Sequence, residues 1–358
     1  MASLTPRIDR FQKNYIINGD MRIAQRGTSF AAIADNAYSL DRWRYSKSGA
    51  MVHALTQDTD VPTVAQSGYL FQNSLRLNLT TPDTSIAAGD FLILNQKVEG
   101  YNWANLAQKP FTLSFWVKAT LPGTYCVSLA SGGGDRSYIV EYTINTANTW
   151  EKKVLNIIAS PSTGTWNYSN GIGLDIRWVL ASGTTYHTTA NTWNTGNLLS
   201  TSNQVNGVNT GATDFRITGV MLSEGTLTDP EFTLFGKDFE AELRACQRYY
   251  EKSYDTTTTP GTATVLGFHY GGYTAVGSYG TICFPYRVVK RALPTHITRD
   301  GAGSAGFVSN FSAGSAAQTN GISISGVTIG QTTTSIYISN GSGIPVWFGA
   351  QFTAEAEL

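Results

Sequence analysis

Three tryptophans stand apart in this chain because they lie among asparagine, glycine, serine and threonine. They are Trp103 in YNWANL, Trp166 in STGTWNYSNG and Trp193 in HTTANTWNTGN, and Tyr168 and Tyr186 accompany the last two. An aromatic ring can cover the apolar face of a sugar while neighbouring amides and hydroxyls bond to the sugar hydroxyls. These five residues therefore predict a glycan-binding surface on loops. The alternative is that each ring folds back over the edge of a β-sandwich.

A second candidate contact lies in the glycine-rich stretch SGGGDRS. Asp135 and Arg136 follow three consecutive glycines, so a charged pair stands on a permissive backbone. Such a pair can bond to sugar hydroxyls from a loop. The alternative is a turn closed by a local ion pair.

Catalytic and metal chemistry find little support in the residue pattern. A sugar-cleaving enzyme needs two carboxylates about 5–10 Å apart, and the acids here are singletons in sequence. The three cysteines and four histidines are isolated, without CxxC or HExxH spacing. The GxGxxG string at 301–306 has no βαβ unit around it. We therefore expect no enzymatic activity, no catalytic residue, no cofactor and no metal.

Charge and composition exclude two classes of partner. The 358 residues include 25 basic and 25 acidic side chains, so the formal net charge is zero and no basic stripe for nucleic acid exists. No apolar run approaches the ~18 residues of a membrane helix, so we expect no membrane insertion. At about 150 residues per domain, the length predicts two domains.

Period-two alternation of apolar and polar residues predicts strands through most of the chain. The pattern is typical of half-buried strands separated by turn clusters. It predicts an all-β fold in which residues 14–235 form a jelly-roll β-sandwich. Trp43 stands between Arg42 and Arg44, so its ring is expected in the core with both arginines facing outward. The predicted strands are 42–45, 74–80, 111–118, 138–144, 174–178 and 215–218.

One segment has helical periodicity instead. Residues 236–252, GKDFEAELRACQRYYEK, place Phe239, Leu243, Cys246 and Tyr250 on a single apolar stripe. A lone amphipathic helix after a complete sandwich either packs on a sheet or contacts copies of itself. We expect these four residues to form an oligomer contact, most simply in a homotrimer.

The two ends of the chain have different patterns. Residues 253–358 return to short strand patterns at 281–284, 321–325, 335–339 and 347–352, which predicts a smaller C-terminal β-sandwich domain. Residues 1–13 carry bulky and basic side chains without alternation. We expect this segment to anchor the chain to a partner protein, with a disordered start as the alternative.

Four blocks in the first 252 residues resemble a family of bacteriophage tail and fibre proteins. They are NGDMRIAQRG at 18–27, YSLDRW at 38–43, LSFWVK at 113–118 and CQRYYEK at 246–252. The resemblance implies a jelly-roll module similar to carbohydrate-binding modules, on a virion protein that is commonly trimeric. It defines no catalytic residue. The chain also lacks a signal peptide, as expected of a virion protein released by lysis.

Three functions follow as hypotheses. The first is a tail fibre or receptor-binding protein that attaches to host surface polysaccharide and docks on other virion proteins through residues 1–13. The second is a purely structural virion component, such as a collar, head fibre or baseplate decoration. The third, a polysaccharide depolymerase, is disfavoured because the acids are isolated and no solenoid repeat is visible.

Overall fold

The computed structural model describes residues 12–211, 213–273, 279–312, 318–339 and 346–358. The chain divides into two compact units, the first made of Met1–Ala24 and Thr28–Glu242 and the second of Gln25–Gly27 and Leu243–Leu358. Residues 1–11, most of the expected anchor segment, lie outside the described residues. Among the described helices, none is both long and apolar enough to cross a membrane.

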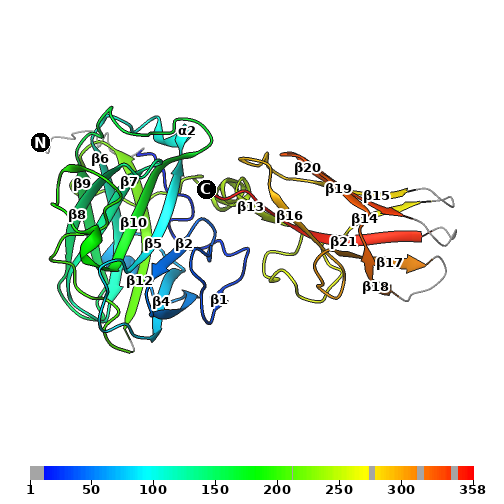
Figure 1. The fold of residues 1–358 in the computed structure, drawn as a ribbon, viewed down its shortest axis with the longest axis horizontal. Coiled ribbons are helices and arrows are strands. Elements are labelled where there is room, and N and C mark those ends of the chain that lie inside the picture. The colour runs from blue at the N-terminus through cyan, green and yellow to red at the C-terminus, as the bar shows by residue number, and fades with distance from the viewer. Residues whose placement is uncertain (1–11, 212, 274–278, 313–317, 340–345) are drawn as a thin grey trace, which may run out of the picture. The chain divides into compact units, whose positions relative to one another are not determined.

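The first unit is a sandwich of two six-stranded antiparallel sheets (Figure 1). Sheet A contains, in spatial order, β1 (Ser29–Phe30), β3 (Val52–Asp58), β4 (Ser74–Thr81), β12 (Asp214–Glu224), β6 (Phe111–Ala119) and β9 (Glu151–Ile157). Sheet B contains β11 (Trp193–Thr195), β8 (Arg136–Ile144), β7 (Gly123–Ser131), β10 (Ile172–Ser182), β5 (Phe91–Glu99) and β2 (Arg44–Ser48). Short helical turns, α1 (Val64–Ser67), α2 (Gly100–Trp103) and η2 (Thr184–Tyr186), lie in the connections. The predicted jelly-roll β-sandwich is confirmed.

The core of this sandwich contains Trp43, as the alternation predicts. Its ring is fully buried, lies 5.3 Å from the Trp178 ring, and its indole nitrogen donates to the Asn18 carbonyl at 3.0 Å. The outward position expected for Arg42 is wrong. Strand β2 begins only at Arg44, and Arg42 has φ 73° and is 1% exposed. A tight turn, rather than a strand, therefore presents the ring to the core.

The N-terminal segment that carries the first resemblance block holds the sandwich together through buried side chains. Asn14 donates to the Val220 carbonyl at 3.2 Å and accepts from the Leu222 amide at 3.0 Å. Asn18, with φ 58°, donates to the Asp41 carbonyl at 3.0 Å. Buried amide groups of this kind satisfy backbone groups that no sheet ladder reaches. The first resemblance block and the residues just before it therefore stabilise the fold.

The second unit is a smaller all-antiparallel β unit built around β21 (Val346–Glu355). The first half of β21, up to Ala350, pairs with β14 and β17, while the second half, up to Glu355, pairs with β13 and β16 (Figure 1). Its core contains Phe284, Phe348 and Phe352. The remaining strands are β13 (Tyr250–Lys252), β14 (His269–Tyr273), β15 (Tyr279–Pro285), β16 (Thr295–Arg299), β17 (Phe307–Ser312), β18 (Gln318–Ser323), β19 (Gly326–Ile329) and β20 (Thr333–Ser339).

The predicted amphipathic helix exists but is shorter than expected. Helix α3 covers Phe239–Gln247, and Asp238 caps it by accepting from the Ala241 amide at 2.8 Å. Tyr250, expected on the helical stripe, lies instead in β13 opposite Glu355 of β21. Pairing with a long strand satisfies the backbone of Tyr250–Lys252, which a frayed helix end would leave unpaired.

The expected oligomer contact on this helix is also wrong for three of its four residues. Leu243, Cys246 and Tyr250 are 7%, 0% and 6% exposed, so the chain itself covers them. Only Phe239, which is 47% exposed, remains on the surface. An apolar stripe that is already buried cannot form the main contact between copies.

Candidate functional site

Trp103, the first of the predicted stacking residues, is a core residue. It ends helix α2 and is 0% exposed, and its ring meets Phe111 edge-on at 5.7 Å. A Cβ on Gly173 would lie 2.3 Å from the Trp103 Cβ, so glycine is needed for this close approach. The expectation that Trp103 contacts glycan is therefore wrong, because the sandwich covers its ring.

Trp166 and Trp193, the other two predicted tryptophans, come together at the edge of the sandwich. Trp166 stacks on the buried Trp103 ring with centroids 5.3 Å apart and 24° between the ring planes. Trp193, on β11, meets Trp166 edge-on at 5.6 Å and Tyr138 at 5.3 Å. Both rings are partly buried and pack against the main core, so each keeps a portion of its surface open. We call Trp166 and Trp193 the rim pair.

The indole nitrogens of the rim pair are tied to backbone. Trp166 Nε1 donates to the Thr163 carbonyl at 3.1 Å, and Trp193 Nε1 donates to the Ile158 carbonyl at 3.4 Å. Each bond fixes the ring direction, so an arriving ligand would meet rings already in place. Preorganised rings reduce the entropy that binding must overcome.

Asp135 connects the loop that carries Trp166 to the glycine-rich loop. Its carboxylate accepts from the Thr165 amide at 2.9 Å, from the Thr165 hydroxyl at 2.9 Å and from the Ser131 hydroxyl at 2.8 Å. The Thr165 amide hydrogen bond contributes most to lowering the pKa of Asp135 to about 2. Asp135 is therefore ionised and structural, holding the residue next to Trp166.

Arg136 and Tyr168 are the polar neighbours available to a ligand. The Arg136 guanidinium donates to the Asp135 backbone carbonyl at 2.8 Å and to the Thr195 hydroxyl at 3.4 Å. Tyr168 is 44% exposed two residues after Trp166. Arg136 thus reaches β11, the strand that carries Trp193, whereas Tyr168 is near the rim pair along the chain.

Tyr186 does not join this surface. Its ring meets Phe91 edge-on at 5.4 Å and packs into a separate apolar cluster with Ile93, Val179 and Leu199. Because Leu92 and Leu94 point into the main core, Ile93 lies on the opposite, outer face of sheet B. Tyr186 therefore covers the back of that sheet, and the expectation that it contacts glycan together with Trp193 is wrong.

A cluster of polar side chains also lies on this outer face of sheet B, and the sequence analysis did not predict it. Asp175 on β10 accepts from Asn95 at 2.8 Å and from Arg177 Nε at 2.9 Å. Burial opposes ionisation, yet Arg177 and Lys97 outweigh it and keep the pKa of Asp175 below its usual value. Burial also lowers the pKa of Lys97 to about 8. The sequence signal was present as polar residues inside the apolar runs FLILNQKVE and GLDIRWVL.

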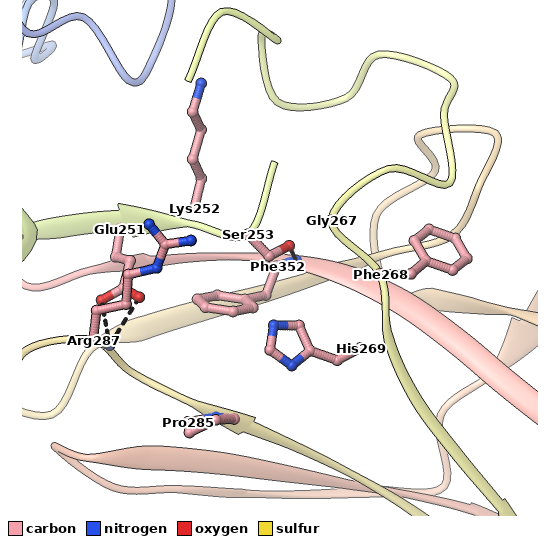
Figure 2. A pocket seen from close by; sticks show the side chains of 9 residues that line it. All are labelled: Glu251, Lys252, Ser253, Gly267, Phe268, His269, Pro285, Arg287 and Phe352. Carbon is pink, nitrogen blue, oxygen red and sulfur yellow. Dashed lines mark hydrogen bonds between the residues drawn. The ribbon is translucent and has the colours of Figure 1, made fainter. Parts of the chain in front are cut away.

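The second unit contains a hollow of about 320 Å³ (Figure 2). The rings of His269 and Phe352 line it with centroids 5.6 Å apart. The Arg287 amide donates to both Glu251 carboxylate oxygens, at 3.0 and 3.2 Å, as the dashed lines show. The ammonium of Lys252 donates to two backbone carbonyls of its own unit. Most polar groups here therefore serve the fold, and no predicted glycan-binding residue lies among them.

The described part of the chain contains no candidate metal-binding cluster. No group of three or more His, Cys, Asp or Glu side chains there is close enough to hold a metal ion.

The comparisons with known proteins find similar structures but no similar sequences. No protein-family profile and no curated protein sequence matches the chain. The enzymatically active domain of tailspike protein 4 of bacteriophage CBA120 is 16% identical with a TM-score of 0.33, and the match covers 59% of this chain and 21% of that one. The chain thus spans about a fifth of that tailspike structure.

Two carbohydrate-binding modules are also similar in structure. A family 61 module, solved with β-1,4-galactotriose, is 12% identical with a TM-score of 0.32, over 60% of this chain and 99% of the module. A family 11 module of a cellulosomal cellulase from Clostridium thermocellum is 10% identical with a TM-score of 0.29, over 55% of this chain and 95% of the module. Likenesses at this level assign no function.

Proposed function

We propose that the first unit binds glycan through the rim pair. The observation that carries this proposal is that Trp166 and Trp193 meet at the sandwich edge, partly open, on a third and fully buried indole. Indole faces suit the apolar face of a sugar, Arg136 adds a guanidinium group next to the strand of Trp193, and Tyr168 is exposed two residues after Trp166. The proposal assigns no catalytic step to the chain.

The biological role that we propose is attachment of a bacteriophage particle to host surface polysaccharide. The support is the amino-acid sequence and the order of the four blocks that resemble phage tail and fibre proteins. A single stacking site binds weakly, so a trimer with three copies would raise the overall affinity through effective concentration. In this proposal the protein is a virion component and the N-terminal segment docks on other virion proteins.

A structural role without receptor binding is the second candidate, and one observation favours it. The resemblance blocks supply buried residues of the sandwich, such as Trp43, Phe115 and Val117, whereas the rim pair lies outside every block. A shared scaffold does not require a shared ligand.

A glycan array probed with the purified full-length protein separates the two candidates. Attachment predicts retention of at least one surface polysaccharide, and the same polysaccharide should block adsorption of the particle to cells. A structural role predicts an empty array and adsorption that the free protein does not inhibit. Trp347→Ala is a useful second variant. This tryptophan of the second unit is 62% exposed, so a loss of binding in the variant would place the glycan site in the second unit.

A further inference from the structure

A second hollow lies on the outer face of sheet A, away from every residue predicted to bind glycan. Its volume is about 660 Å³, within the range of about 300–1,000 Å³ that small-molecule sites occupy. Strands β6 and β9 contribute Trp116 and Lys152, and the connections at 66–69 and 229–232 supply the walls. The hollow is therefore built from segments that are far apart in the sequence.

Aromatic rings form one side of this hollow. The ring of Tyr69 meets Phe232 edge-on at 4.9 Å, and both pack on Phe71, at 4.7 and 5.2 Å. Trp116 lines the same space with 8% of its surface exposed. Gly219 makes this packing possible, because a Cβ there would lie 2.6 Å from Phe71 and 3.0 Å from Trp116. The rings are thus locked by their neighbours.

A partly buried ion pair positions the tyrosine of this group. Arg22 donates to the Tyr69 hydroxyl at 2.6 Å and also pairs with Asp20, which is 1% exposed. The phenol oxygen accepts from Arg22, so its own hydrogen is directed elsewhere. The first resemblance block therefore contacts one ring of the hollow, that of Tyr69, through Arg22.

Polar side chains line the hollow beside these rings, and their charges select the ligand. Lys152 donates to the Asp229 carboxylate and to the Pro230 carbonyl at 2.8 Å. Asp229 is 83% exposed at its side chain, so its carboxylate retains acceptor capacity toward an incoming hydroxyl. Glu231 adds a second carboxylate to the lining against the single ammonium. This balance is unfavourable for an anionic ligand.

We propose that this hollow is a second carbohydrate site, which takes a short neutral oligosaccharide. The rings cover the apolar face of a sugar, while Asp229 and Lys152 accept from and donate to its hydroxyls. The proposal shares only the ligand class with the proposed function, since it uses a different sheet and none of the residues around the rim pair. The two sites can therefore fail independently.

The test measures binding of maltotriose, cellotriose and chitotriose, with trigalacturonic acid as the anionic probe, by ligand-observed NMR on the full-length protein. It compares Trp166→Ala with the double variant Trp166→Ala/Asp229→Ala. Glu224→Ala in the same background is the matched control, because Glu224 is half-exposed and pairs with Lys109 outside the hollow.

We expect at least one neutral trisaccharide to bind the Trp166→Ala protein and to bind about tenfold more weakly after Asp229→Ala, with no change after Glu224→Ala. The proposal is overturned if Trp166→Ala removes all neutral binding, if Asp229→Ala has no effect, or if trigalacturonic acid binds best. Loss of all trisaccharide binding in the Trp166→Ala single variant would still agree with glycan binding by the rim pair. Binding that is unchanged by Trp166→Ala and weakened by Asp229→Ala would support the hollow and would not bear on the rim pair, which has its own test.

Discussion

The ring of Trp166 lies on the ring of Trp103, with centroids 5.3 Å apart and an interplanar angle of 24°. Trp103 is fully buried, so the more exposed indole has a rigid base within the core. This arrangement couples the packing of the sandwich to the geometry of the rim pair. Changes beneath the surface should therefore alter binding as well as stability.

The Asp135 carboxylate gives a direct test of this coupling. Asp135→Asn keeps the size of the side chain but replaces a charged acceptor of the Thr165 amide by a neutral one. We expect weaker glycan binding, about threefold to tenfold, because the loop next to Trp166 loses its fixed position. Binding isotherms of the parent and the variant check this, and unchanged affinity would show that the loop needs no such anchor.

Trp43→Ala should be among the most damaging single changes in the first unit. The side chain is fully buried against Trp178 and donates to the Asn18 carbonyl. Removing it leaves a cavity that should lower the free energy of unfolding by about 3–5 kcal/mol. Denaturant unfolding of the variant measures this directly. A loss below about 1 kcal/mol would mean that the core closes around the gap.

Glu242 should make the first unit less stable as the pH rises toward neutrality. Burial is the largest influence on this carboxyl and raises its pKa to about 7. The folded unit then holds a proton that the unfolded chain releases near pH 4.5, so stability falls between pH 4.5 and 7.

Glu242→Gln removes this proton linkage. Relative to the parent, the variant should gain about 3 kcal/mol in unfolding free energy between pH 4.5 and 7.5, from about 1.4 kcal/mol per pKa unit. Parallel unfolding curves at four pH values give the difference. A constant difference across this window would contradict the buried, protonated carboxyl.

His296 should have the opposite effect on the second unit. Burial, the main cause, and His269 lower the pKa of His296 to about 4, and its ring stacks on Phe352 at 5.4 Å with 18° between the planes. The unfolded chain takes up this proton near pH 6.5, so stability is lost as the pH falls from 6.5 to 4.

His296→Phe tests this prediction with the stacking preserved. The variant loses the bond between His296 Nδ1 and the Tyr286 hydroxyl, which also contacts Thr334 at 2.6 Å. We expect thermal unfolding of the second unit to depend less on pH between 6.5 and 4 than in the parent. Equal pH dependence in both proteins would assign the acid sensitivity to another group.

The sequence predicted strands in which polar and apolar side chains alternate and missed others, including β5 and β7. β10 was predicted although it is buried on both faces, because Asp175 and Arg177 alternate with its core residues. β4 and β12 alternate clearly because their outer side chains, such as Arg76 and Arg216, remain polar. β5 and β7 do not, since the connection that carries Tyr186 and Leu199 covers the outer face of sheet B. Period-two patterns disappear when a strand is apolar on both sides.

The candidate site was predictable only in part for a related reason. Loop composition identified Trp166 and Trp193 correctly as neighbours of polar residues, and the same rule selected Trp103, which packs inside. Composition describes the neighbours along the chain, whereas burial depends on which strands close over a ring. The hollow on sheet A gave no local signal, because Tyr69, Trp116 and Lys152 come from separate segments.

The most direct test of the rim proposal is the affinity of Trp166→Ala and Trp193→Ala for a glycan that the parent protein retains on the array. Each variant should bind about tenfold more weakly, since a lost stacking contact is on the order of 1–2 kcal/mol at about 25 cal/mol per Å². Both variants should keep a cooperative unfolding transition, and Trp347→Ala should bind like the parent. Parent-like affinity in both folded rim variants would contradict glycan binding by the rim pair.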